Sequence, residues 1–355
     1  MLAELSGREE EIRRRVAEQL DAYLPADPSE VRSMVRLHLG GTWDGRTRDD
    51  IFLNLSFLHN YAPPWFGAAE GILAHEVTHI AHRQLDVLPE DAVTPVGLFA
   101  VGLSQIHSEG IARQIETGLL EGSYPRGTYA ALVANRHRDG LVDFAGTFAR
   151  LEEMRETCLR RMDQPACRNL IRSGLWRGGA TYVLGQGMAR AIEGALGRKT
   201  LGSTLSAGAI RFFELYAQAT RMLPGLPALG EGFDRDLAAA AAFLAERREA
   251  WRLSRDAHAA HGRGDYETSA AMFQRIAGRD TSNPIAAYNV ACALARTGDL
   301  GRAMEWLDRA VTLGYSDRAH MEADPDLDPL RNGKRYRRLV DRLSSPPAVP
   351  NRSMK

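Results

Sequence analysis

The chain has 355 residues, of which 44% are apolar and 25% are charged, a composition typical of a globular protein with two domains or one domain and an appendage. Acidic and basic residues balance at 45 each, so overall charge argues against a nucleic-acid partner or binding to a membrane surface. No run of about 18 apolar residues occurs, so we expect no membrane span.

The N-terminal segment predicts a helix. Residues 8–24 place apolar side chains at helical spacing between charged ones and end before Pro25, which gives an N-terminal helical segment within residues 1–29. The segment lacks the apolar stretch of a signal peptide, so the cytoplasm is the expected location unless an upstream leader is missing.

The chain contains three cysteines, and no two of them form a C-x-x-C pair. We interpret Cys158, Cys167 and Cys292 as isolated thiols. Cys158 and Cys167 could pair across a short loop if the protein were exported.

Two segments alternate apolar and other residues with a period of two. Residues 35–39 and 51–57 therefore predict a β-hairpin or two neighbouring strands, with the Asp44–Gly45 turn signal between them. The second segment lies just upstream of the histidine motif described below. It could be an edge strand that pairs with an extended substrate, or simply a core strand.

Most of the remaining chain predicts helices. The expected helices cover residues 65–84, about 96–120, 127–162, 180–197 and 206–221. The first domain would then occupy residues 30–222. Residues 223–236 are rich in glycine and proline and predict a linker.

Two stretches of the C-terminal part align with a period of 34 residues. Gly264 aligns with Gly298, and the aligned pairs around them are Ala257 with Ala291, Tyr266 with Leu300, Ser269 with Ala303, and Phe273 with Leu307. This helix–turn–helix period resembles the tetratricopeptide repeat, a class whose units need neighbours to bury their apolar faces. We expect repeat-like helices over residues 237–343, able to bind a protein partner, and a disordered tail at 344–355.

The segment "LAHEVTHIAHRQ" carries the clearest chemical motif. His75 and His79 lie four residues apart, so a helix places both imidazoles on one face, where they can bind one zinc ion. Glu76 leaves an adjacent side of the helix, close enough to reach a metal-bound water. This is the H-E-x-x-H arrangement of metallopeptidases.

A catalytic zinc site needs a third protein ligand. His82 and Leu85 occupy the positions where a metzincin would have glycine and histidine, which excludes that subclass. Glu109 in "HSEGIARQIETG" is the expected ligand, and small residues after it would let two helices approach closely.

Three nearby residues compete with Glu109 or could support the site. Glu116 lies two helical turns further along the same face, so it is the rival ligand. His82 could support the ligands, line the cleft or pack structurally. His107 points away from Glu109 on a helix and is expected to be exposed or to cap the helix.

The mechanism implied by these residues is hydrolysis by zinc-activated water. Zinc lowers the pKa of its bound water and polarises the scissile carbonyl. Glu76 would accept the proton and deliver it to the leaving amine. Tyr182, or a histidine not yet identified, would stabilise the oxyanion, although Tyr182 could equally be a core residue.

Three segments in this order, "ILAHEVTHIAHR", "HSEGIARQIETG" and "YVLGQGMARAIEGALGRKTL", resemble an uncharacterised family of zinc-dependent peptidases of the gluzincin type over roughly residues 30–220. The resemblance implies a mainly α (α+β), zincin-like domain with a small β-sheet, followed by the repeat-like helices. It also implies Zn2+ as cofactor and a peptide or protein substrate. A catalytically silent repeat scaffold, or a zinc hydrolase of a non-peptide amide, are the alternatives.

Overall fold

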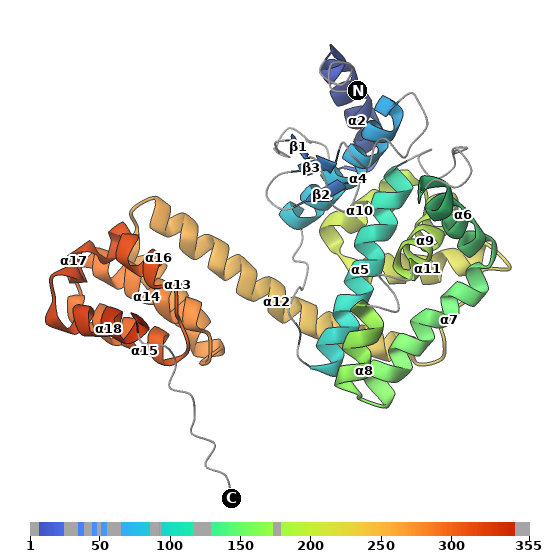
Figure 1. Cartoon of the computed structure of the whole chain (residues 1–355). Helices are drawn as coiled ribbons and strands as arrows, with labels where there is room; N and C mark the ends of the chain where they lie inside the picture. Colours follow the sequence, from blue (N-terminus) through green and yellow to red (C-terminus); the bar gives the residue numbers. More distant parts are fainter. Residues whose placement is uncertain are drawn as a thin grey trace, which may run out of the picture. The chain divides into compact units, whose positions relative to one another are not determined.

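A computed structural model describes most of the chain. The described residues are 7–24, 35–38, 45–47, 51–54, 65–85, 92, 94–116, 129–172 and 179–344. They form two compact units, Met1–Glu246 and Arg247–Lys355, both built mainly of helices (Figure 1). The expectation of a mainly α protein is confirmed. No helix within the described ranges is both long and apolar enough to cross a bilayer.

The first helix, α2 (Glu9–Asp21), buries one apolar stripe. Ile12, Val16 and Leu20 follow one another at four-residue spacing and all lie in the core of the first unit. Beyond the helix, the Tyr23 hydroxyl donates a hydrogen bond to Glu193 (2.9 Å), which ties this end of α2 to a helix far along the chain.

A three-stranded sheet follows, with β1 (Val35–His38), β2 (Gly45–Thr47) and β3 (Ile51–Asn54) in the order β1-β3-β2. The two segments predicted to be extended, β1 and β3, are parallel neighbours, and the antiparallel partner of β3 is the short β2. Because β3 is paired on both sides and buries Ile51 and Leu53, it is a core strand within its described residues. The alternative of an edge strand at 51–57 that pairs with substrate is therefore wrong for residues 51–54. Residues 55–57 lie outside the described part.

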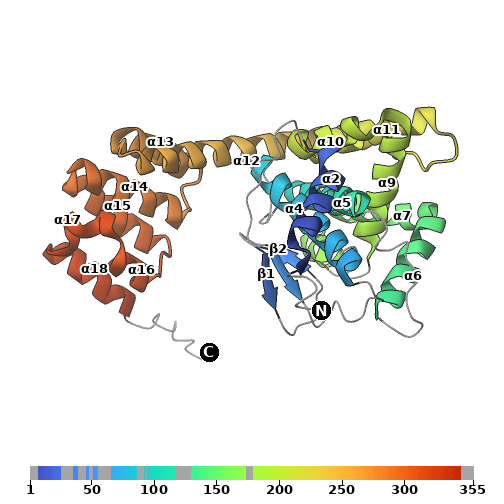
Figure 2. The ribbon, with the colours of Figure 1, turned by 90° about the horizontal axis from the view of Figure 1, so that it is seen from above.

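Two long helices form the centre of the first unit. The strands β2 and β3 lie against α4 (Trp65–Leu85), and α4 packs on α5 (Pro95–Ile115) (Figures 1 and 2). Thr94 begins α5 by accepting a hydrogen bond from the Gly97 amide (3.1 Å), with Pro95 at the first helical position. The helix ends at Ile115, five residues before its predicted end at about 120, and residues 117–128 lie outside the described part.

The helix α5 packs most closely against α9 (Ala180–Leu196). A Cβ atom added to Gly110 would lie 2.3 Å from the carbonyl carbon of Gly185, and one added to Gly185 would lie 2.1 Å from the Ile106 oxygen. The two backbones therefore touch, which only glycine permits at both positions. The small residues after Glu109 were expected to let the metal-binding helices approach, but the close approach at Gly110 is with α9.

Two predicted helices are interrupted. The one expected at 127–162 consists of α6 (Tyr129–Val142), α7 (Phe144–Arg155) and a π-helix, η2 (Glu156–Arg160). Asp143 separates α6 from α7 by accepting a hydrogen bond from the Gly146 amide (3.1 Å), which starts a new helix. The one expected at 206–221 is α11 (Ala209–Met222), preceded by α10 (Arg198–Ala207), and Gly208 divides them with φ 85°.

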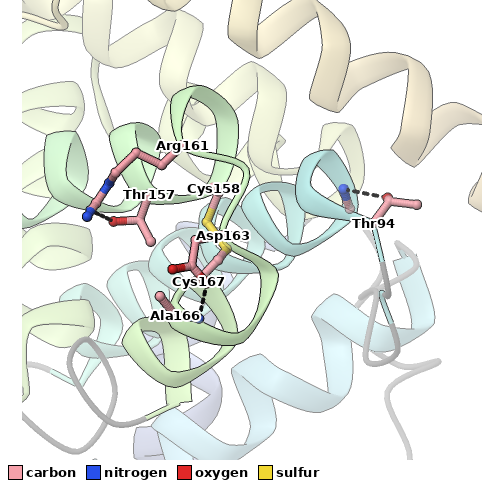
Figure 3. Close-up of a disulfide and its surroundings, with 8 residues drawn as sticks. Thr94, Thr157, Cys158, Arg161, Asp163, Ala166 and Cys167 are labelled. Carbon is pink, nitrogen blue, oxygen red and sulfur yellow. Dashed lines mark hydrogen bonds between the residues drawn. A yellow bond between two sulfur atoms is a disulfide. The ribbon is translucent and has the colours of Figure 1, made fainter.

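A disulfide joins η2 to α8 (Gln164–Asn169). Cys158 and Cys167, nine residues apart, are bonded to each other and fully buried (Figure 3). The interpretation of these two as isolated thiols is therefore wrong. The turn that brings them together is fixed by Asp163, whose side chain accepts a hydrogen bond from the Ala166 amide (3.0 Å). Cys292, in the second unit, is a buried free thiol.

The division between the units differs from the predicted linker at 223–236. The long helix α12 (Phe233–Gly262) already begins within that segment, and Phe233 is buried in the first core. Asp236 is bound there by Arg155 (2.5 Å) and Arg160 (2.6 Å), so the end of the predicted linker is anchored to the first unit. The boundary lies within α12, between Glu246 and Arg247.

The second unit continues with helix pairs. Its elements are α13 (Tyr266–Arg279), α14 (Pro284–Thr297), α15 (Leu300–Thr312), α16 (Arg318–Ala323), η4 (Pro325–Leu327), α17 (Asp328–Arg331) and α18 (Lys334–Ser344). The 34-residue period has a structural counterpart, because Gly264 and Gly298 adopt φ of 80° and 86°. In both copies the next residue, Asp265 or Asp299, caps the following helix at 3.2 Å. Residues 345–355 of the predicted tail lie outside the described part.

We expect the disulfide to contribute about 2–3 kcal/mol to the free energy of unfolding of the first unit, because it closes a short loop in the unfolded chain. Cys158→Ser/Cys167→Ser should lower the midpoint of urea denaturation accordingly. Thiol labelling of the unfolded, unreduced protein should detect one free cysteine, and labelling after reduction three. Three thiols without reductant in protein made under oxidising conditions would contradict the pairing.

We expect Gly185→Ala to destabilise the first unit by about 3 kcal/mol or more, because the added methyl group meets backbone atoms that cannot move aside. Gly194→Ala is the matched control on the same helix, since its new Cβ would meet only Leu223, at 4.0 Å. The control should be neutral or stabilising by up to about 1 kcal/mol. Equal unfolding midpoints for the two variants would refute the tight α5–α9 contact.

Candidate metal centre

Two predicted ligands meet on α4. Because His75 and His79 are one helical turn apart, their imidazoles lie on one face, with ring centroids 4.8 Å apart. Their Nε2 atoms face each other at 3.1 Å. The side chains are 9% and 16% exposed, so the pair is largely shielded from solvent without being sealed off.

The third predicted ligand arrives from α5. Glu109 Oε2 lies 3.4 Å from Nε2 of His75 and 3.4 Å from Nε2 of His79. The three donor atoms thus form a nearly equilateral triangle. Ligands at 2.0–2.1 Å from a tetrahedral zinc ion are separated by about 3.3–3.4 Å, so these spacings match those that zinc requires.

The donor set also fits a metal chemically. Buried Glu109 Oε2 makes no hydrogen bond of ordinary geometry to any described residue, although it faces two imidazole nitrogens. Two neutral imidazoles and one carboxylate are a ligand set of catalytic zinc sites, which leave a fourth position for water. His75, His79 and Glu109 could therefore hold zinc.

The charges of the cluster are strongly coupled. Burial and the charge of Arg113 act to lower the pKa of His75, but Glu109 and Glu116 outweigh them and raise this pKa to about 10. Burial acts to raise the pKa of Glu109, yet His79 and His75 hold it well below its usual range. Without metal the cluster therefore retains a proton between its nitrogens and its carboxylate at neutral pH.

Each of the two histidines has a polar neighbour at its other ring nitrogen. His75 Nδ1 lies 2.9 Å from Glu116 Oε2, and His79 Nδ1 lies 3.0 Å from the Ser108 hydroxyl. Such partners fix the tautomer and orientation of a metal-binding histidine. Glu116, considered as the rival ligand, thus lies on the far side of the His75 ring from the three converging donors.

Glu116 is itself held in place. Its side chain is 1% exposed, and Arg113 Nη1 donates to both of its oxygens, at 2.6 and 2.8 Å. The Arg113 guanidinium stacks over the ring of Tyr182, 4.9 Å from the centroid. Tyr182, predicted to stabilise the oxyanion, is half-buried on α9. Its ring contacts Arg113, which in turn binds Glu116.

Glu76 and the two further histidines are all buried, with His82 and His107 fully so. The expectation that His107 is exposed or caps a helix is wrong. His107 faces away from Glu109, but α10 and α11 cover that side, where it forms a hydrogen bond with Thr204 (2.9 Å) and packs on Phe212. His82 packs edge-on against His107, with centroids 4.6 Å apart, in keeping with its structural alternative.

One buried histidine near the site was not singled out by the sequence. His137 on α6 forms a short hydrogen bond with Gln186, whose amide lies 3.5 Å from the Arg113 carbonyl oxygen. Burial lowers the pKa of His137, with smaller opposing effects of Gln186 and Glu116. It stands alone in "NRHRD", and only its tertiary contacts reveal it.

A second group of potential ligands occurs in the other unit. Cys292, Asp324 and Asp326 place donor atoms within 4.8 Å of one another. These carboxylates already have partners, since Tyr288 donates to Asp324 (2.7 Å) and His261 lies 2.7 Å from Asp326. Because these contacts join helices of the repeat-like unit, the group is explained by its role in packing.

Comparison with known proteins agrees with this picture. The profile of the family described as "Putative zinc dependent peptidase (DUF5700)" matches residues 1–225. A chloroplastic protein of Arabidopsis thaliana is 30% identical over 80 residues, which are 22% of this chain and 24% of that protein. The chain thus spans about a quarter of that relative's length. No solved structure gives a significant match.

We expect zinc affinity to fall as pH falls. The raised pKa of His75 means that this group still carries a proton at pH 7 in the metal-free protein, and zinc must displace it. Displacement of one proton weakens binding about tenfold for each pH unit below that pKa. Competition with a chelator of known affinity at pH 6.5, 7.5 and 8.5 measures the slope. An affinity that does not change with pH would show that His75 is unprotonated before zinc binds.

Proposed function

The chain belongs to the family of "putative zinc dependent peptidases", and from this premise we propose that it hydrolyses peptide bonds at a gluzincin-type zinc site formed by His75, His79 and Glu109. One observation carries the proposal. The three donor atoms converge at 3.1–3.4 Å from one another, at the spacing of a tetrahedral zinc site.

The protein's own residues would divide the work of hydrolysis. Bound zinc supplies a water of lowered pKa and polarises the scissile carbonyl. Glu76 follows the first proposed ligand on α4, and its carboxylate would accept a proton from the attacking water and deliver it to the leaving amine nitrogen. Partial burial of His75, His79 and Glu109 lowers the local dielectric constant and so strengthens the interactions between charges at the site.

A residue that stabilises the oxyanion is also needed. Tyr182 is the residue proposed from sequence, and its ring lies on Arg113 beside Glu116. This contact supports a place for Tyr182 at the edge of the site.

The substrate proposed is a peptide or protein, and the second unit would bind a partner or position the substrate. The support for a tetratricopeptide-like array is the repeated pair of a left-handed glycine and a capping aspartate, 34 residues apart. Three of the aligned pairs are buried in both copies: Ala257 with Ala291, Ser269 with Ala303, and Phe273 with Leu307. Hydrolysis of a non-peptide amide would use the same residues, and a peptide library distinguishes it.

The test of catalysis is Glu76→Gln. This variant should bind about one zinc ion as the wild type does, yet cleave a peptide library about 100- to 10,000-fold more slowly, because it lacks the general base. Glu70→Gln is the matched control, since Glu70 is a buried carboxylate on the same helix whose charged partner is Arg15.

The control should keep both zinc and activity, whereas His79→Ala and Glu109→Ala should lose zinc. Metal content by mass spectrometry and cleavage rates by chromatography give these readouts. Absence of zinc from the wild type after reconstitution would sink the peptidase proposal. Zinc without any cleavage would favour the catalytically silent scaffold or the non-peptide amide.

A further inference from the structure

We propose that Arg113 and Glu116 form an outer clamp that holds the His75 ring in its ligating orientation, and that Tyr182 acts on this clamp rather than on the substrate. The inference rests on the proposed zinc site and deepens it. The three residues are Arg113 on α5, Glu116 at the C-terminal end of α5, and Tyr182 on α9.

The first step is the orientation of the His75 ring. An imidazole can bind one metal ion through one nitrogen only, and Nε2 is the atom that faces His79 and Glu109. Nδ1 points the opposite way and lies 2.9 Å from Glu116, an ion-pair contact whose angle falls outside ordinary hydrogen-bond geometry. A carboxylate this close favours a proton on Nδ1 and so leaves the Nε2 lone pair free for the metal.

The second step is how α5 supplies both carboxylates. Glu109 lies within the helix, and seven residues, or about two turns, separate it from Glu116. Glu116 is the residue after the last helical one, with its amide bonded to Ala112 (3.0 Å) and ψ at 62°. The helix thus presents one carboxylate to each side of the His75 ring.

The third step is the charge of the clamp. Glu116 is almost fully buried beside a site that already contains Glu109, and a second uncompensated carboxylate there would be costly. Arg113 contacts both oxygens of Glu116 and neutralises it. The clamp therefore offers a fixed hydrogen-bond acceptor without adding net negative charge to the site.

The fourth step is the anchor on α9. The Tyr182 ring covers the guanidinium of Arg113 at 4.9 Å, a distance typical of a cation–π contact. Gln186, one turn further along α9, lies 3.5 Å from the Arg113 carbonyl oxygen. Since α9 and α5 touch at Gly185 and Gly110, these contacts hold Arg113 between two helices that cannot slide apart easily.

The first experiment measures zinc affinity by chelator competition for the wild type, Glu116→Gln and Glu193→Gln. Loss of the outer carboxylate should weaken zinc binding about 10- to 100-fold. Glu193→Gln is the matched control, because Glu193 is a partly buried carboxylate bound by Tyr23, Gln114 and Arg198. It should bind zinc as the wild type does.

These outcomes separate the clamp from the peptidase proposal. Equal affinities in the wild type and Glu116→Gln would overturn the clamp while leaving the zinc site intact. No zinc in the wild type would instead overturn the proposed function. Tyr182 variants provide a second test that leaves Glu116 in place, for the case that Glu116→Gln does not fold.

The second experiment compares Tyr182→Phe with Tyr182→Leu. If the ring acts on Arg113, Tyr182→Phe keeps both zinc affinity and kcat, whereas Tyr182→Leu weakens zinc binding about three- to tenfold. If the hydroxyl stabilises the oxyanion, Tyr182→Phe lowers kcat about 100-fold at unchanged zinc affinity. The second pattern would overturn the role assigned to Tyr182.

Discussion

The backbone contact between Gly110 and Gly185 is the constraint on which the candidate site depends. At this point a Cβ atom on either glycine would lie 2.1–2.3 Å from backbone atoms of the other helix, so a side chain there would push α5 and α9 apart. Glu109 is the residue next to Gly110, and Arg113 lies one turn on. The contact therefore fixes the position of α5, which carries the proposed third ligand and the proposed clamp, while α4, packed on α5, carries the two histidines.

This arrangement explains why the charged residues of the site can be buried. Two buried carboxylates of the site have partners of opposite or potentially opposite charge: Glu109 faces the two imidazoles, and Glu116 is bound by Arg113. A buried carboxylate without such a partner would cost several kcal/mol of stability, on the order of the net stability of a domain. The site is thus a balanced set of charges in which an ion can replace a proton.

The residues that sequence could predict are those fixed by local helix geometry. His75 and His79 follow from a spacing of four, and Glu109 from its place on the next helix. Glu116 could not be assigned, because its position depends on where α5 ends. The burial of His107 depends on coverage by α10 and α11, a tertiary effect that no spacing reveals.

The helices and strands of the fold likewise divide into those that local sequence patterns predict and those that depend on tertiary contacts. The helices around 65–84 and 180–197 were predicted because their apolar periodicity is continuous. The break at Asp143 was missed because a single capping side chain ends a helix whose pattern otherwise continues. The helix α10 was not predicted, and Gly208, with its positive φ, divides it from α11. Likewise, the parallel pairing of β1 and β3 depends on the crossover between them, whose course alternation alone does not specify.

The disulfide bears on the redox conditions under which the protein folds. Cys158 and Cys167 are only nine residues apart, so their bond can form as soon as this short stretch of chain meets an oxidant. Stable structural disulfides belong to oxidising surroundings such as the periplasm, the lumen of the endoplasmic reticulum or the extracellular space. The cytoplasmic location expected from the sequence stays a prediction, and the disulfide does not favour it. A bond of this kind is retained where thiol oxidants prevail over reductants.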